Sequence, residues 1–434
     1  MINALNILIT ICSAIGIFWT VARAYEYILW IVGFFKKVEF KPTTNFHNYG
    51  ICIAARNEEC VIKNILESIE NQDYKKDKIT VFVVADNCTD STAKIARDFG
   101  EQSKKRKNGI NVVVYEHNNK DERTKGFALR YLFDQIKADY GIKAFDGYFV
   151  FDADNVLAPD YITRMNEAFD VGSDAVISFR NSKNIFQNWI SFSYAMHWLR
   201  TSLFEHRGKS VLHLSCRVQG TGFMFANHFV ENGWNYTSLT EDRAFCTDVV
   251  VQGYRVTYCE AAKFYDEQPY KLKVSLRQRL RWSKGHLQSA AENEPKLIKN
   301  IFKFNKTSVL AYDTFFLNFP GTIESGFRRI FTWILNITIA ILLHKLWGGA
   351  LGILKGVGIS LATYWLARVF LATITYIFYR KQIGKVGFFK LLYYIFMFPF
   401  FDYIGKWTSY VALFKKIEWK PIPHDYVVDV KKLK

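Results

Sequence analysis

The hydrophobic pattern divides the chain into an apolar start, a soluble middle and an apolar last third. Residues 1–22 carry no charged side chain, and apolar residues resume over 25–35. A helix of that first length rises about 33 Å, enough to cross a hydrocarbon core of about 30 Å. A signal peptide is the competing interpretation, but it would have a charged start and a shorter apolar core. The pattern favours a retained membrane helix.

The last third contains three long apolar segments, at residues 330–343, 346–379 and 391–414. Three crossings after the soluble region would leave the basic end of the chain outside the cell, against the positive-inside rule. Pro399 and Asp402 could instead break the last segment into a hairpin or an interfacial helix. We therefore expect a cytosolic tail.

In the middle of the chain, short apolar runs typical of strands alternate with patterns typical of helices. Short runs rich in Val, Ile, Phe and Tyr predict buried strands at residues 49–54, 79–85, 111–116 and 147–151. Helical patterns lie between them at residues 58–70, 89–99 and 124–136. Strand and helix in alternation predict an α/β domain with a mostly parallel sheet. The polar stretch 100–109 is expected to be a solvated loop.

Polar groups follow three of these strands. They are Arg56-Asn57-Glu58, Asp86-Asn87 and Asp152-Ala153-Asp154. Ligands of such sheets bind outside the carboxyl ends of the strands, so a site is expected there. The motifs GxGxxG, GxxxxGK[ST] and GxSxG do not occur, so the usual dinucleotide, P-loop and serine-hydrolase interpretations lack their signatures.

Composition narrows the class further. The 434 residues are 50% hydrophobic and 17% aromatic, which excludes a disordered or collagen-like chain. The net charge of +17 is compatible with nucleic acid, an anionic membrane or an anionic substrate. The basic residues cluster beside the membrane segments, so no nucleic-acid partner is expected. Seven cysteines without a CxxC pair predict reduced core residues.

Two motifs carry candidate chemistry of unequal specificity. Asp152 and Asp154 form a DxD that can help to hold a divalent cation, although chance alone supplies roughly one such tripeptide. Gln278, Arg281 and Trp282 form QxxRW, a motif that is expected by chance only about 0.01 times in a chain of this length. Arg281 offers a planar fork for a pyrophosphate and Trp282 a flat surface for a sugar or nucleotide. The surrounding basic stretch, 271–286, also suits a helix on an anionic membrane surface.

Two further motifs have structural alternatives. Thr240-Glu241-Asp242 precedes a helical pattern at 243–252, where a capping Thr and two acids would also suit a helix start. Gly220-Thr221-Gly222 precedes the predicted strand 223–226 and could be a turn.

Taken in order, Asp86, the DxD, the Thr-Glu-Asp and the QxxRW resemble the signature of membrane-embedded family 2 glycosyltransferases. That family includes cellulose, hyaluronan and chitin synthases. Residues 219–225 and 239–268 are most similar to bacterial exopolysaccharide synthases, and the resemblance covers about residues 45–290. Many polymer synthases have Asp-Gly where this chain has Asn87-Cys88.

The resemblance implies a GT-A fold that uses a nucleotide-diphosphate sugar. Asp86 would contact uracil or ribose with Arg56 and Glu58 nearby, Lys125 would meet the diphosphate, and Asp152 and Asp154 would hold the donor and Mg²⁺ or Mn²⁺. Asp242 would be the general base within Thr240-Glu241-Asp242. Gly220, Thr221 and Gly222 would border the substrate, while Gln278, Arg281 and Trp282 would close over the diphosphate and the acceptor.

Elementary chemistry supports these roles. A cation stabilises the charge that develops on the leaving diphosphate, and a carboxylate removes the proton of the attacking hydroxyl. One base without a protein nucleophile gives a single displacement with inversion, so an α-linked donor yields a β-linked product.

The expected organisation is a membrane helix (1–36), a GT-A domain (45–270), interface helices with QxxRW (271–325), membrane helices (326–415) and a basic tail (416–434). We expect a multi-pass protein of the inner or plasma membrane with a cytosolic catalytic domain. The expected function is processive polymerisation of UDP-glucose or UDP-N-acetylglucosamine onto a growing polysaccharide and its movement across the bilayer, a role compatible with a separate secretion partner. Transfer of one sugar to a lipid and a non-catalytic scaffold are the alternatives.

Overall fold

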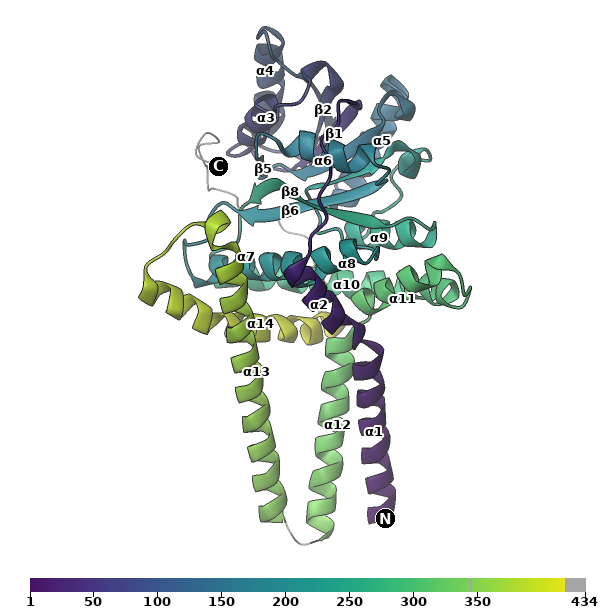
Figure 1. Cartoon of the computed structure of the whole chain (residues 1–434), viewed down its shortest axis with the longest axis vertical. Helices are drawn as coiled ribbons and strands as arrows, with labels where there is room; N and C mark the ends of the chain where they lie inside the picture. The colour runs from purple at the N-terminus through teal and green to yellow at the C-terminus, as the bar shows by residue number, and fades with distance from the viewer. Residues whose placement is uncertain (344–345, 418–434) are drawn as a thin grey trace.

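The computed structural model describes residues 1–343 and 346–417, so most of the tail expected at 416–434 lies outside the described residues. A domain built on one sheet sits at one end of three long helices (Figure 1). These are α1 (Ile2–Ala22), α12 (Gly321–Leu342) and α13 (Leu346–Ile383). The last helix, α14 (Phe388–Phe414), runs across the base of the domain instead of alongside α13.

The sheet has eight strands in the order β3-β2-β1-β4-β7-β6-β8-β5. Their bounds are β1 Tyr49–Ala55, β2 Ile79–Asp86, β3 Asn111–His117, β4 Gly147–Asp152, β5 Val156–Leu157, β6 Ala175–Ser182, β7 Phe223–Ala226 and β8 Val256–Asp266. The first four spatial neighbours run parallel, with Tyr49 in register with Ile79 and Gly147. β7 runs antiparallel to β4 and β6. The predicted α/β GT-A class with a mostly parallel sheet is confirmed.

Helices cover both faces of the sheet, which is why its strands are apolar on both sides. One face packs against α3 (Ile62–Glu70), α4 (Thr92–Lys104) and α6 (Tyr161–Asp170). The other packs against α5 (Lys125–Asp139), α7 (Trp189–Thr201) and α9 (Glu241–Val251). Tyr379 of α13 and Tyr394 of α14 belong to this second core, so the long helices and the domain share one hydrophobic cluster.

The remaining elements of the described chain are helical. They are α2 (Tyr25–Phe35), α8 (Arg207–Val211), α10 (Leu272–Ile301), α11 (Lys306–Asn318), the π-helix η3 (Ser202–His206) and the 3₁₀ turns η1 (Lys76–Lys78), η2 (Ile142–Ala144) and η4 (Asn227–Val230). The basic stretch expected at 271–286 is thus the first half of a much longer helix.

Two local predictions were wrong in part, since α4 ends at Lys104 and five of the seven cysteines are buried. The stretch 100–109 was expected to be a loop, but α4 continues to Lys104, because the buried Ser103 hydroxyl bonds Glu70 and the backbone N–H of Ile110. Of the cysteines expected in the core, Cys60 is exposed in the loop after β1 and Cys88 is half-buried.

Three stretches of the described chain are long and apolar enough to cross a membrane: Ile2–Phe35, Leu351–Ile383 and Phe388–Phe414. The third is α14, which buries Tyr394, Phe398 and Phe401 as it crosses beneath the domain. The composition of α14 therefore suits a membrane crossing, whereas its position beneath the domain suits the expected interfacial helix.

A glycine sets how closely α10 approaches the start of α9. A β-carbon at position 285 would lie 2.4 Å from Thr240 Cγ2 and 3.2 Å from Leu239 Cβ. Glycine inside a helix costs about 1 kcal/mol relative to alanine, so a close contact explains its presence here.

We expect Gly285→Ala to lower the free energy of unfolding by about 1–3 kcal/mol, because the added methyl group overpacks this contact. Gly352→Ala in α13 is the matched control, since no atom lies within 4 Å of a β-carbon there. Thermal unfolding in detergent would measure both changes. Equal midpoints for the two variants would contradict the overpacking.

Candidate active site

One cavity of about 300 Å³ lies at the carboxyl ends of β1, β2 and β4. Residues from every predicted motif line it: Arg56, Glu58, Asp86, Lys125, Asp152, Asp154, Gly220, Thr240, Glu241, Asp242, Gln278, Arg281 and Trp282. Thr221 and Gly222 do not reach the cavity wall. The structure therefore brings together four motifs that span about 200 residues of chain.

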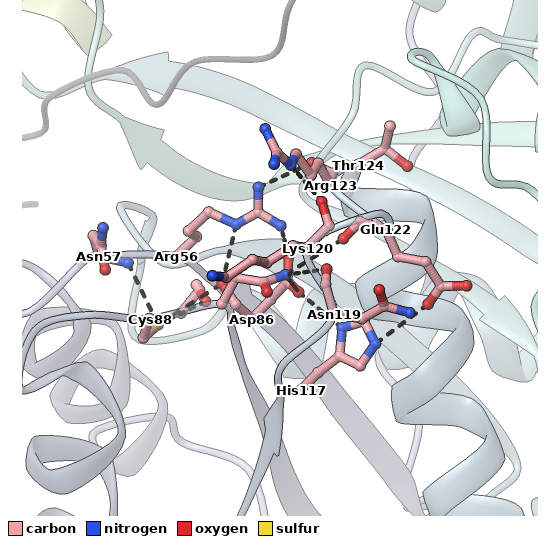
Figure 2. A network of polar contacts seen from close by, with 12 residues as sticks. Arg56, Asn57, Asp86, Cys88, His117, Asn119, Lys120, Glu122, Arg123 and Thr124 are labelled. Atoms are coloured by element: carbon pink, nitrogen blue, oxygen red, sulfur yellow. Dashed lines mark hydrogen bonds and ion pairs between the residues drawn. The ribbon is translucent and has the colours of Figure 1, made fainter.

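Asp86 ends β2 at one side of the cavity and is only 4% exposed (Figure 2). The guanidinium of Arg56 pairs with its carboxylate and also donates to the backbone carbonyls of Asp86 and Arg123, at 3.0 Å each. On the other side, His117 Nδ1 lies 2.9 Å from Asp86 Oδ1. The carboxylate thus has a fixed plane.

Lys125, the first residue of α5, links two edges of the cavity. Its ammonium pairs with the Asp152 carboxylate and donates to the carbonyl of Gly220 at 2.7 Å. The backbone N–H of Asp152 donates to Thr221 Oγ1 at 2.9 Å. Gly222 has φ +67°, and a β-carbon there would lie 2.3 Å from the Phe264 ring. The Gly-Thr-Gly segment is thus a tight turn that supports the cavity from beneath.

Asp154 lies deeper, 5% exposed, and accepts hydrogen bonds from Asn155 Nδ2 at 3.0 Å and the Glu267 N–H at 3.1 Å. Carboxylate oxygens suit Mg²⁺ and Mn²⁺. The described residues contain no group of three or more His, Cys, Asp or Glu side chains arranged to hold a metal ion. The two carboxylates of Asp152 and Asp154 form a donor set that suits a divalent cation whose remaining ligands are phosphate oxygens and water.

Thr240, Glu241 and Asp242 stand where α9 begins. Thr240 is the N-cap residue and the two acids lie in the first turn, so the expectation that this motif stands at the start of a helix is confirmed. Thr240 Oγ1 nevertheless caps no N–H and is buried without a partner among the described residues. Burial raises the pKa of Glu241 to about 7 against the opposing charge of Lys125. Burial also raises the pKa of Asp242, opposed by Arg243.

α10 closes the cavity with the QxxRW residues. Within the described chain, Gln278 Oε1 and Arg281 Nε are buried without a hydrogen-bond partner. Burial lowers the pKa of Arg281, while the charges of Glu241 and Asp152 oppose that shift. Trp282 meets the rings of Tyr194 and Trp198 edge-on, at 6.1 and 5.8 Å between centroids. The indole is held in place while the polar atoms of its neighbours remain available to a ligand.

Residues 47–285 match the family described as "Glycosyltransferase like family 2". This chain belongs to that family. "Probable glycosyltransferase YdaM" of Bacillus subtilis is 26% identical over 323 residues, covering 69% of this chain and 70% of that protein. A "Probable glycosyltransferase" of Sulfolobus acidocaldarius is 24% identical over 315 residues, covering 70% and 62%.

A solved structure shares the fold of this glycosyltransferase. It is the mannosyltransferase PcManGT from Pyrobaculum calidifontis in complex with GDP-Man and Mn²⁺, with a TM-score of 0.59 and 17% identity. The match covers 89% of this chain and all of that chain. The likeness therefore extends beyond the sheet domain into the flanking helices.

The glycosyltransferase cavity also contains residues that sequence reasoning missed. They are Arg123, Arg180, His197, Trp198, Arg217, Arg243, Asp266 and His286. Burial lowers the pKa of His197 to about 3 and that of His286 well below its usual value, so both imidazoles are neutral at pH 7. No motif marks them; a charged Arg180 inside an apolar strand was the one available signal.

Arg180 and Asp266 form an ion pair at the far wall of the cavity. Burial raises the pKa of Asp266 to about 6 despite the Arg180 charge, and Asp154 adds to the increase. The Arg180 guanidinium lies 4.1 Å from the Trp198 ring centroid. This pair ties β6 and β8 to α7, the helix that supports Trp282.

Proposed function

We propose that this glycosyltransferase is an inverting, metal-dependent enzyme that polymerises a UDP-sugar into a β-linked polysaccharide at the membrane. UDP-glucose and UDP-N-acetylglucosamine are the candidate donors. The supporting observation is that buried carboxylates at the start of α9 share one cavity with the cations of Lys125 and Arg281. That combination suits a reaction in which a hydroxyl attacks while a diphosphate leaves.

At the donor end, Asp86 receives the uridine, with Arg56 and Glu58 beside it. Lys125 and Arg281 stabilise the negative charge that grows on the leaving diphosphate. A divalent cation held by Asp152 and Asp154, when bound, neutralises part of the same charge. Asp152 and Asp154 stand on a rigid strand end, so little reorganisation is needed during the reaction.

At the acceptor end, Asp242 accepts the proton of the attacking hydroxyl. Its raised pKa makes it a stronger base than an exposed aspartate, and burial keeps water from competing. The described chain offers no serine or cysteine among the cavity-lining residues to act as a covalent nucleophile. With Asp242 as the base and no covalent intermediate, the proposed reaction is a single displacement with inversion.

Membrane attachment brings the acceptor to the same face. We assign residues 1–36 and 326–415 to the membrane part, 45–270 to the GT-A domain and 271–325 to interface helices. In this arrangement α1 and α13 cross the bilayer, and α12, which packs beside α1 but is not among the three stretches found long and apolar enough to cross, crosses with them. Helix α14 lies in the plane of the bilayer with exposed aromatic residues such as Phe389, Phe396 and Trp407. Three crossings from an outside N-terminus leave the catalytic domain and the end of α14 on the cytosolic side.

A second function is favoured by the same membrane helices. In each of the segments Ile2–Phe35 and Leu351–Ile383, only 6% of the most apolar 18-residue stretch is buried. Such exposed helices suit delivery of a lipid acceptor better than a conduit, whose lining must be enclosed. The second candidate is therefore transfer of one sugar to a lipid.

Asp242→Asn is expected to lower kcat by about 10²–10⁴-fold, because the amide cannot accept the hydroxyl proton. In the wild type, a base must be ionised, so kcat/KM should fall as pH drops through the raised carboxyl pKa. This acid limb should lie above the usual aspartate value of about 3.9. Radiolabelled sugar transfer in nanodiscs measures both quantities.

Asp248→Asn is the matched control, since Asp248 lies on α9 but bonds Tyr236 and Gln252 outside this cavity. Full transfer by the Asp242 variant would remove that residue as the base.

Removal of divalent cations with EDTA should abolish transfer, and Mg²⁺ or Mn²⁺ should restore it. Asp154→Asn should raise the cation concentration needed for half-maximal rate by about 10–100-fold, because a buried carboxylate ligand is lost. Asp160→Asn serves as the control, since Asp160 is partly exposed and pairs with Arg164. Unchanged transfer in EDTA would contradict the metal requirement.

Inside-out membrane vesicles test product and orientation together. With the catalytic domain cytosolic, donor added outside such vesicles should be used, and a translocated polymer should become protected within the lumen. A high-mass protected product supports the polymerase, whereas a lipid-sized product extracted by organic solvent supports single transfer. Use of donor only after the vesicles are permeabilised would overturn the orientation.

A further inference from the structure

A chain of polar contacts connects Asp86 to His117 and Glu122 (Figure 2). His117, the last residue of β3, lies with Nδ1 2.9 Å from Asp86 Oδ1 and Nε2 3.3 Å from Glu122 Oε2. Glu122 in turn pairs with Arg130 of α5 at 2.5 Å. His117 itself is 7% exposed and does not line the cavity, so it can act on a ligand only through Asp86.

The imidazole is held in both position and plane. Its ring stacks on Tyr131, with 4.6 Å between centroids and 29° between planes. Because each ring nitrogen faces a carboxylate, the ring donates from both only as the imidazolium. Charge-assisted hydrogen bonds of this kind are stronger than neutral ones. The Asp86 carboxylate is thereby held in one orientation by His117.

Asn87 adds a second donor to the same oxygen. Its Nδ2 lies 2.9 Å from Asp86 Oδ1 and 3.0 Å from the carbonyl of Asn119. The residue has φ +50°, a backbone conformation that asparagine tolerates better than most residues. An aspartate here would offer no donor to Asp86. Asn87 and His117 therefore both hold Asp86 Oδ1.

We propose that His117 is a positioning residue that, with Glu122 and Asn87, fixes the Asp86 carboxylate for recognition of the donor base. A carboxylate acceptor in a fixed plane matches a base with a ring N–H, as in uracil, and is mismatched with the acceptor ring nitrogen of cytosine. The inference rests on the proposed role of Asp86 in nucleotide binding. It assigns to His117 both donor affinity and discrimination between these bases.

A core histidine that only packs would behave differently under substitution. His117→Phe retains a ring to stack on Tyr131 but removes both N–H donors. His117→Gln retains one donor towards Asp86. Glu122→Gln removes the carboxylate that faces His117 Nε2. Glu116→Gln is its matched control, because Glu116 is partly exposed and pairs with Arg97 away from Asp86.

The test measures UDP and CDP binding by calorimetry, with Mn²⁺, on the full-length protein in nanodiscs, alongside steady-state transfer. We expect His117→Phe to weaken UDP binding and raise KM by about tenfold or more, with kcat changed less than about twofold. CDP binding should change little, so the preference for UDP should shrink. His117→Gln should recover part of the affinity, and Glu122→Gln should cost about threefold.

The two residues should also be coupled. Glu122→Gln should have no further effect in the His117→Phe background, whereas independent residues would give additive effects. Wild-type UDP affinity in His117→Phe, or a fall in kcat at unchanged KM, would overturn the proposal. An equal loss of UDP and CDP binding would show that His117 only packs in the core and would also overturn the proposal. Absence of UDP binding by the wild type would instead overturn the proposed donor.

Discussion

Parallel strands end at a common edge, and the chemistry of this glycosyltransferase depends on that constraint. β1, β2 and β4 are neighbours in the sheet, so the residues that follow them are brought together from positions almost a hundred residues apart. Asp86, Asp152 and Asp154 come from that edge alone. The helices then add what the edge lacks: a cation from α5, carboxylates from α9 and a lid from α10.

Three ion pairs lie among the residues that line the cavity. Arg56 pairs with Asp86, Lys125 with Asp152 and Arg180 with Asp266. In the proposed reaction, a diphosphate with its cation would exchange with the Lys125–Asp152 pair, because Lys125 would then meet phosphate oxygens and Asp152 would meet the metal. Internal pairing reduces the cost of burying so many charges in the absence of substrate. Gln278 and Arg281 are the contrast, since each has a buried polar atom without a partner in the described chain.

The membrane part is packed into the enzyme as well as attached to it. Side chains of α13 and α14 belong to the same hydrophobic cluster as α5, α7 and α9. α14 also touches α10, where Ser283 lies within hydrogen-bond distance of Thr408 and Arg279 donates to the carbonyl of Phe401. The helix that carries QxxRW is therefore braced by the helix at the membrane face.

The sequence by itself determined the fold class and most of the cavity. Strand–helix alternation predicted the sheet, and polar residues at strand ends marked its ligand edge, because both are local consequences of burial period and chain direction. Ordered motifs added Thr240-Glu241-Asp242 and QxxRW. Only tertiary structure decided the rest. His197 and Trp198 lie on an apolar helix whose pattern signals core, and His117 was hidden at the end of a strand. The partners of these residues come from distant parts of the chain, and only long-range packing brings them within contact distance. The placement of α14 likewise followed from its buried contacts with the domain, which hydropathy cannot register.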